Sequence, residues 1–190
     1  MKGKGRMLLH ACCAPCFTVV CRGFMEEGYD LTAFFCNPNI HPWKERKRRL
    51  QALKDYTASL GIPLLVDQGY PLEENIRMLL EADNRCRACF SQRLGAAALK
   101  AAQEGMDCFS TTLSVSPYQN QQMIRSAGET AGSESGIPFV YRDFRSHYRE
   151  SVQMSREAGL YRQPYCGCVF SERDRYLKIR SPGQLEDPDQ

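Results

Sequence analysis

The stretch MLLHACCAPC, residues 7–16, sets the expectation for the fold. Its first half, Met7–Ala11, is a short apolar run that predicts a buried strand, and the cysteines begin at the turn directly after it. Pro15 lies where proline favours the first turn of a helix, which we expect over Pro15–Glu27. The stretch therefore predicts a strand, a cysteine-rich turn and a helix in direct succession.

Strand and helix signals alternate along the rest of the chain. We expect strands over Leu31–Cys36, Ile62–Val66, Met106–Leu113 and Ile137–Tyr141, and helices over Trp43–Leu60, Glu73–Leu80, Cys86–Glu104, Tyr118–Glu134 and Ser146–Gly159, with an irregular segment over Leu160–Val169. This order predicts an α/β fold with a parallel sheet, in one domain over residues 1–180, followed by a loose acidic tail over residues 181–190. Ligands of such sheets bind beyond the carboxyl ends of the strands.

Seven of the ten cysteines form three close-set groups. The groups are Cys12, Cys13 and Cys16; Cys86 and Cys89; and Cys166 and Cys168. Soft sulfur ligands select iron–sulfur clusters, zinc or copper(I), so a fold that gathers these groups predicts a metal site at the carboxyl ends of the strands. Seven thiols exceed the four that a single zinc ion or cubane cluster takes, which leaves open two centres, or one cluster with additional redox-active thiols.

Composition is that of an ordinary globular protein, with 43% hydrophobic and 25% charged residues and a net charge of +3. No apolar run approaches the ~18–20 residues of a membrane helix, and we expect no membrane partner. The apolar run before Cys12, Met7–Leu9, is shorter than the ~7–15 residues of a secretion signal, so we expect a cytoplasmic protein. In that reducing compartment, grouped cysteines indicate metal binding or catalysis rather than structural disulfides.

Basic residues crowd the start of the helix expected after Pro42. They are Lys44, Arg46, Lys47, Arg48 and Arg49, beside Trp43. Positive charge at a helix N-terminus opposes the macrodipole, so stability does not explain the cluster, whereas binding of nucleic-acid phosphates would. An aromatic side chain beside basic residues can stack a base. We therefore expect Trp43 and these basic residues to bind RNA, with a solvated helix face as the alternative.

Hydroxyl side chains follow the fourth expected strand, at Thr111, Thr112, Ser114 and Ser116, and suit anions or nucleoside groups. Tyr118, Asn120 and Asp143 are further polar candidates for the same crevice.

Taken together, these residues resemble the QueH family of epoxyqueuosine reductases. The motifs that carry the resemblance are LHACCAPC (residues 9–16), NPNIHP (37–42), CRACF (86–90), TTLSVSP (111–117), DFR (143–145), SREAGLYRQ (155–163) and YCGC (165–168). They run in order from about residue 7 to residue 177, which is nearly the whole chain.

The resemblance implies the last step of queuosine formation, in which epoxyqueuosine at the wobble position of tRNA loses its epoxide oxygen. It implies a cobalamin-independent oxidoreductase with a 4Fe–4S cluster, a further mononuclear iron, and an external electron donor such as a ferredoxin or flavodoxin. It also implies a Rossmann-like, HUP-type fold in which the cysteine turn replaces a Gly-rich pyrophosphate loop. The cluster and metal ligands would come from Cys12, Cys13, Cys16, Cys86, Cys89, Cys166 and Cys168, with Cys13, Cys16 and Asp143 as catalytic residues.

Three other functions stay open on the residues alone. A zinc-binding RNA module predicts zinc without sulfide, and a HUP-type thiolation enzyme predicts ATP hydrolysis although no Ser-Gly-Gly loop is present. A dithiol oxidoreductase working through Cys86 and Cys89 predicts activity without iron.

Overall fold

The computed structural model describes residues 3–178, so the expected acidic tail lies outside the described residues. The strands are β1 (Gly5–His10), β2 (Tyr29–Phe35), β3 (Leu64–Val66) and β4 (Cys108–Thr111). The helices are α1 (Ala14–Glu26), α2 (Trp43–Ser59), α3 (Leu72–Glu81), α4 (Arg85–Gln103), α5 (Gln121–Ser135), α6 (Tyr148–Glu157) and α7 (Val169–Tyr176), with short 3-10 turns η1 (Thr112–Val115) and η2 (Arg145–His147).

The four strands form one parallel sheet in the order β3-β2-β1-β4. In the register, Met7 of β1 pairs with Leu31 of β2 and with Cys108 of β4. All carboxyl ends therefore lie along one edge of the sheet, and the turn after central β1 lies between the ends of β2 and β4. The expected α/β class with a parallel sheet is confirmed.

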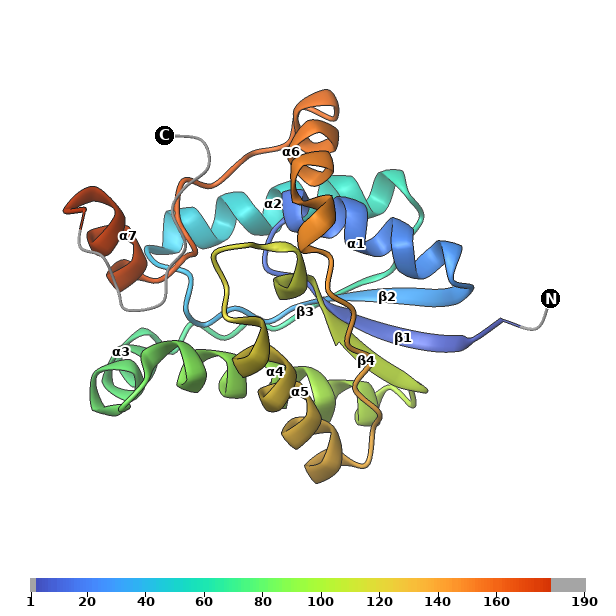
Figure 1. The fold of residues 1–190 in the computed structure, drawn as a ribbon, viewed down its shortest axis with the longest axis horizontal. Helices are drawn as coiled ribbons and strands as arrows, with labels where there is room; N and C mark the ends of the chain where they lie inside the picture. Colours follow the sequence, from blue (N-terminus) through green and yellow to red (C-terminus); the bar gives the residue numbers. More distant parts are fainter. Residues whose placement is uncertain (1–2, 179–190) are drawn as a thin grey trace.

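Helices cover both faces of the sheet: Figure 1 shows α1, α2 and α6 on one side and α3, α4 and α5 on the other. The period of two along β1 divides the core, because Met7 and Leu9 join the apolar cluster under α1, whereas Leu8 joins the cluster under α4 and α5. Both faces of β1 are thus fully buried, which explains its continuous apolar run. Within residues 3–178, we find no helix with the length and apolar character needed to cross a membrane.

Three segments differ from expectation. The strand expected over Ile137–Tyr141 is reduced to a single bridge between Phe139 and Phe109, since Pro138 has no N–H to donate to a ladder. The fourth strand ends at Thr111, where the Thr111 hydroxyl accepts from the Leu113 amide and opens a 3-10 turn. Helix α7 follows the last cysteine pair and was not expected; it begins at Cys168, whose backbone and thiol both accept hydrogen bonds from Ser171.

Candidate metal centre

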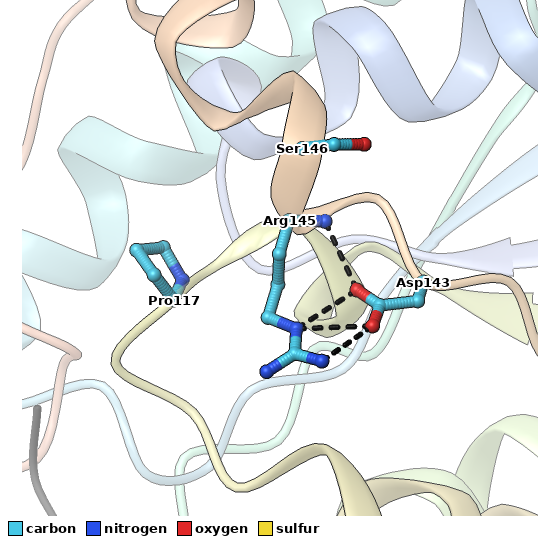
Figure 2. A pocket seen from close by; sticks show the side chains of 4 residues that line it. All are labelled: Pro117, Asp143, Arg145 and Ser146. Atoms are coloured by element: carbon cyan, nitrogen blue, oxygen red, sulfur yellow. Dashed lines mark hydrogen bonds and ion pairs between the residues drawn. The ribbon is translucent and has the colours of Figure 1, made fainter.

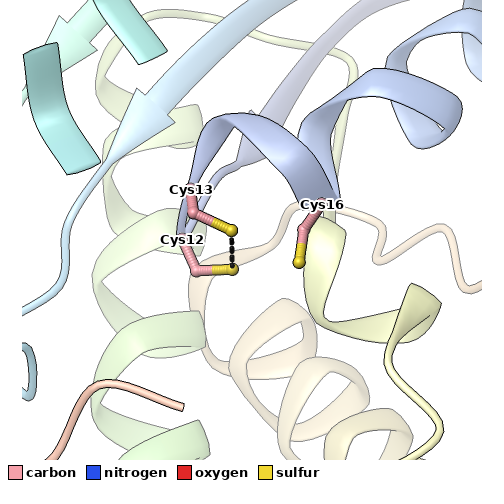
Figure 3. A group of neighbouring side chains, drawn as sticks. All are labelled: Cys12, Cys13 and Cys16. Atoms are coloured by element: carbon pink, nitrogen blue, oxygen red, sulfur yellow. Dashed lines mark hydrogen bonds between the residues drawn. The ribbon is translucent and has the colours of Figure 1, made fainter. Parts of the chain in front are cut away.

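Cys12, Cys13 and Cys16, the cysteine triad, come from the turn that joins β1 to α1 (Figure 3). Cys13 is the N-cap residue, and Pro15 lies in the first turn of the helix, as expected. The three sulfur atoms lie within 4.8 Å of one another, and those of Cys12 and Cys13 are 3.6 Å apart. A strand that stops and a helix that starts within three residues therefore suffice to converge three thiols.

Polar side chains from distant segments hold the triad. The hydroxyl of Thr112 accepts from the Cys12 amide at 3.3 Å and lies 3.7 Å from the Cys12 sulfur. Gln163 donates from its side-chain amide to the sulfur of Cys13 at 2.9 Å. Beneath the turn, the ring of fully buried His10 lies 2.9 Å from the Thr111 hydroxyl and 3.2 Å from the Cys36 carbonyl oxygen. That carbonyl can only accept, so His10 donates from Nε2 and accepts from Thr111.

The three thiols differ in acidity. Hydrogen bonds from Cys13 and Cys16 lower the pKa of Cys12, whereas burial raises the pKa of Cys13 to about 12. The pKa of Cys16 is raised, first by its hydrogen-bonding to Cys12. Cys12 is therefore the thiol that ionises first, and a bound cation would be needed to hold the other two as thiolates.

The cysteine quartet, Cys86, Cys89, Cys166 and Cys168, is assembled from two distant segments. Cys86 and Cys89 lie in the first turns of α4, where the side chain of Asn84 caps the helix. Burial raises the pKa of Cys89 to about 12, and the thiols of Cys166 and Cys168 act in the same direction. Arg85, at the start of α4, pairs with Asp174 at 3.4 Å and lies 4.7 Å from the ring centroid of Phe170, so the fold brings the start of α4 next to the helix that follows Cys168. Within residues 3–178, however, only the triad is tight enough to satisfy metal-ligand spacing without rearrangement.

Arg49 fixes the segment that carries Cys166 and Cys168. Its guanidinium donates to the Cys166 carbonyl oxygen at 2.9 Å and to the Tyr165 carbonyl oxygen at 3.0 Å, and it pairs with Glu45 at 2.7 Å. The backbone of Gly167 approaches so closely, at φ +140°, that a Cβ there would lie 3.0 Å from Ile40. The 165–168 segment is therefore docked on α2 and the loop after β2.

Two of the basic residues that we expected to bind RNA, Arg46 and Arg49, are buried, so this part of the prediction was wrong. Arg46 and Arg49 are 2% and 0% exposed, and Arg46 donates to the Asp67 carbonyl oxygen. Both lie on the inner face of α2 with Leu53, as their helical spacing requires. Neither can meet RNA phosphates at the surface. The exposed remainder of the expected set is Trp43, Lys44, Lys47 and Arg48.

Asp143 lies at an open hollow of about 490 Å³ that is lined by Pro117, Asp143, Arg145 and Ser146 (Figure 2). Its carboxylate accepts from the guanidinium of Arg145 at 2.6–3.0 Å and from the Arg145 amide at 3.1 Å. These bonds lower the pKa of Asp143, so the group is an anion at neutral pH. In the described part of the chain, its hydrogen bonds go to Arg145 and not to a cysteine.

Arg93 is the main residue of the site that the sequence reasoning missed. It is 1% exposed and donates to the Asn37 side-chain oxygen at 2.7 Å, with the sulfur of Cys89 at 3.8 Å. The sequence could have indicated this contact, because Arg93 follows Cys89 by four residues in α4, and residues spaced by four share a helix face. Gln119, which donates to the sulfur of Cys166 at 3.2 Å, and Gln163 were also missed as sulfur partners.

The donor set fits a soft metal or an iron–sulfur cluster. All seven grouped cysteines are free thiols, and three of them converge directly after β1. Among the described residues, the Nε–H of Arg93 and the side-chain amide of Asn39 are buried without a hydrogen-bond partner. Buried polar groups are nearly always satisfied, so these N–H donors require acceptors, which a bound group or an ordered water can supply.

Comparison with known proteins agrees with this chemistry. The family model described as "Epoxyqueuosine reductase QueH" matches residues 7–174. The chain is 38% identical to the epoxyqueuosine reductase QueH of Dehalococcoides mccartyi, over 93% of this chain and 98% of that protein. It is 34% identical to the enzyme of the same name from Thermotoga maritima, over 92% of this chain and 94% of that protein.

Among solved structures, the fold is similar to that of the U34-tRNA thiolase NcsA from Methanococcus maripaludis with its 4Fe–4S cluster. The TM-score is 0.59 at 13% identity, over 96% of this chain and 68% of that one. A predicted subunit of a tRNA methyltransferase from Methanocaldococcus jannaschii gives a TM-score of 0.53 at 11% identity, over 80% of this chain and 75% of that one. These likenesses concern the fold, whereas the family model and the close relatives concern the sequence. The chain belongs to the QueH family of epoxyqueuosine reductases.

Proposed function

We propose that this protein reduces epoxyqueuosine to queuosine at the wobble position of tRNA. Both C–O bonds of the epoxide break, a C=C bond forms, and the oxygen leaves as water after the uptake of two electrons and two protons. The observation that carries the proposal is the convergence of three free thiols within 4.8 Å at the end of β1, in a chain of this family that has four further grouped cysteines. A low-potential external protein, such as a ferredoxin or flavodoxin, would supply the electrons.

The cysteines would hold the redox group. We assign the triad and the quartet together to a 4Fe–4S cluster and a further iron, with Cys13 and Cys16 nearest the reaction and the division of ligands left open. When bound, these groups supply single electrons and a Lewis acid for the epoxide oxygen. This scheme includes no cobalamin.

The protein's own residues set the surroundings of the reaction. Burial of Cys12 and Cys13 beside Thr112 and Gln163 excludes water from these two thiols. Asp143 would orient a substrate hydroxyl as a hydrogen-bond acceptor. It is a poor proton donor at neutral pH, since Arg145 lowers its pKa.

The exposed remainder of the basic cluster would bind the tRNA backbone. Trp43 is 44% exposed, and it is held by Tyr70, whose ring centroid is 5.1 Å away, and by Arg46 at 5.2 Å. A braced, half-exposed indole beside Lys44, Lys47 and Arg48 suits base stacking and phosphate pairing. Replacement of Lys47 by Ala should reduce the slope of log affinity against log salt by about 0.7–0.9.

The decisive test is iron and acid-labile sulfide per chain after anaerobic purification, with EPR of the dithionite-reduced protein. About four sulfides with four to five irons would support the proposal. Mass spectrometry of nucleosides from epoxyqueuosine-containing tRNA would then show queuosine formed. Zinc without sulfide after anaerobic reconstitution would overturn it in favour of a structural zinc module.

A further inference from the structure

Three arginines are fully buried in this protein: Arg46, Arg49 and Arg93. Two of them have a carboxylate to balance their charge. Arg49 pairs with Glu45 at 2.7 Å, and the charge of Asp67 acts on Arg46. Burial of an unbalanced charge is costly, so each buried guanidinium requires a negative partner.

Arg93 has no such carboxylate among residues 3–178. Its neighbours are the neutral amide of Asn37 and the sulfur of Cys89, and the charges that favour its cationic form are those of Cys89, Cys12 and Cys166. One of these cysteines belongs to the triad and two to the quartet. Arg93 therefore contacts the quartet at Cys89, and the charge of Cys12 in the triad also favours its cationic form.

The N–H donors of Arg93 also lack a carboxylate partner among the residues that the structure describes. Nη2 is satisfied by Asn37 and Nη1 faces Cys89, whereas Nε is buried without an acceptor. Asn37 is itself fixed, because its amide donates to the Ala11 carbonyl oxygen at 2.8 Å. The guanidinium is thus oriented before any metal binds, with Nη1 facing Cys89 and the Nε–H left without an acceptor.

We propose that Arg93 is a positioning residue for electron transfer, whose fixed positive charge compensates the thiolate-ligated cluster and stabilises its reduced form. This proposal rests on the function proposed above. A cluster held by thiolates is anionic, and each added electron increases its negative charge, so a buried cation raises the reduction potential. Hydrogen bonds to cluster sulfur act in the same direction.

The test compares Arg93→Gln with Arg93→Lys. Glutamine removes the charge but can still donate to Asn37, whereas lysine keeps the charge. In anaerobically loaded protein, we expect Arg93→Gln to lower the reduction potential of the cluster by ~59 mV, which is a tenfold weaker electron affinity. Arg93→Lys should keep a potential close to that of wild type. Arg46→Lys is the matched control, because Arg46 is equally buried but acts on none of the grouped cysteines.

Thermal unfolding of the apoprotein separates charge compensation from a structural role. We expect apo Arg93→Gln to be no less stable than wild type, since it loses an unbalanced buried charge. If the variant folds but retains no cluster while Arg93→Lys does, the requirement for charge is supported. Wild-type potential in Arg93→Gln, a destabilised Arg93→Gln apoprotein, or loss of the cluster from both variants would overturn the proposal. A wild-type protein that binds no iron and sulfide would instead overturn the proposed function.

Discussion

The triad and the quartet reach the same edge of the sheet by different routes. The triad, Cys12, Cys13 and Cys16, comes from one strand–turn–helix unit, and its sulfurs converge within 4.8 Å. The quartet joins the start of α4 to the 165–168 segment, and its members range from buried Cys89 to exposed Cys86 and Cys166. The triad is formed by local geometry, whereas the position of Cys166 and Cys168 depends on long-range docking.

This difference predicts where the centre is vulnerable. A local turn keeps its shape as long as β1 and α1 form, because the backbone itself converges the thiols. A docked segment depends on each contact that holds it, here Arg49, Gly167 and the loop after β2. Substitutions on the quartet side should therefore cost more stability and more metal than those on the triad side.

The largest effect is expected for Arg49→Met. The substitution leaves the buried charge of Glu45 without a cation, with only the Tyr161 hydroxyl among the described residues donating to it, and frees the carbonyls of Tyr165 and Cys166, so we expect the free energy of unfolding to fall by about 3–5 kcal/mol. Denaturant titration measures this loss. The control Lys47→Met, on the exposed side of the same helix, should change stability by less than ~0.5 kcal/mol. Equal effects of the two variants would contradict the docking role of Arg49.

Gly167→Ala tests the close approach itself. The residue has φ +140°, and an added Cβ would meet Ile40 at 3.0 Å and Arg49 at 3.3 Å, so we expect a loss of about 1–3 kcal/mol together with reduced iron content. Gly95→Ala is the matched control, because its Cβ would meet open space within α4 and should raise stability by ~0.5–1 kcal/mol. Undiminished iron in Gly167→Ala would show that the segment tolerates displacement.

On the triad side, His10 should make stability depend on pH. Burial lowers its pKa from 6.5 to about 3 in the folded protein. Above pH 6.5, the pKa of His10 in the unfolded chain, the ring is neutral in both states and stability does not depend on its titration. Below that pH, the unfolded chain binds a proton that the folded protein does not, so the free energy of unfolding falls by about 1.4 kcal/mol per pH unit. The loss at pH 5.5 is ~1.4 kcal/mol.

Unfolding titrations of wild type and His10→Gln at pH 7.5 and 5.5 measure this contribution. The difference between the two proteins should shrink at the lower pH, since the variant lacks the group that titrates. A constant difference would show that His10 is protonated in the folded state.

The smallest effect is expected for Thr112→Val. The variant keeps the shape of the side chain but removes the hydroxyl that accepts from the Cys12 amide, so we expect a loss of about 0.5–1.5 kcal/mol with the triad still formed. Thr32→Val, at a half-buried position of β2, should stay within ~0.5 kcal/mol of wild type. Loss of all iron from Thr112→Val would break the comparison, because a local turn should survive it.

Several elements could be predicted from the sequence alone because their signals are local. The apolar run of β1, Pro15 in the first turn of α1 and the helical period of α2 act over a few residues, and all three elements are present. The basic cluster was predicted less well. Helix periodicity turns Arg46 and Arg49 inward, but without knowing which face of α2 meets the core, the sequence cannot say which charges stay outside.

The sequence by itself determined the cysteine-rich turn, because strand propensity, proline and the helix period converge those thiols within one short stretch. Only the tertiary structure decided that Cys166 and Cys168 return to the start of α4, since this depends on Arg49 binding backbone carbonyls more than a hundred residues away. It also decided that Arg93 is buried without a carboxylate, because the absence of a partner depends on every element packed around it. Local patterns thus formed the cysteine-rich turn, whereas long-range packing placed the other cysteines and the buried charges, because those contacts join residues far apart in the sequence.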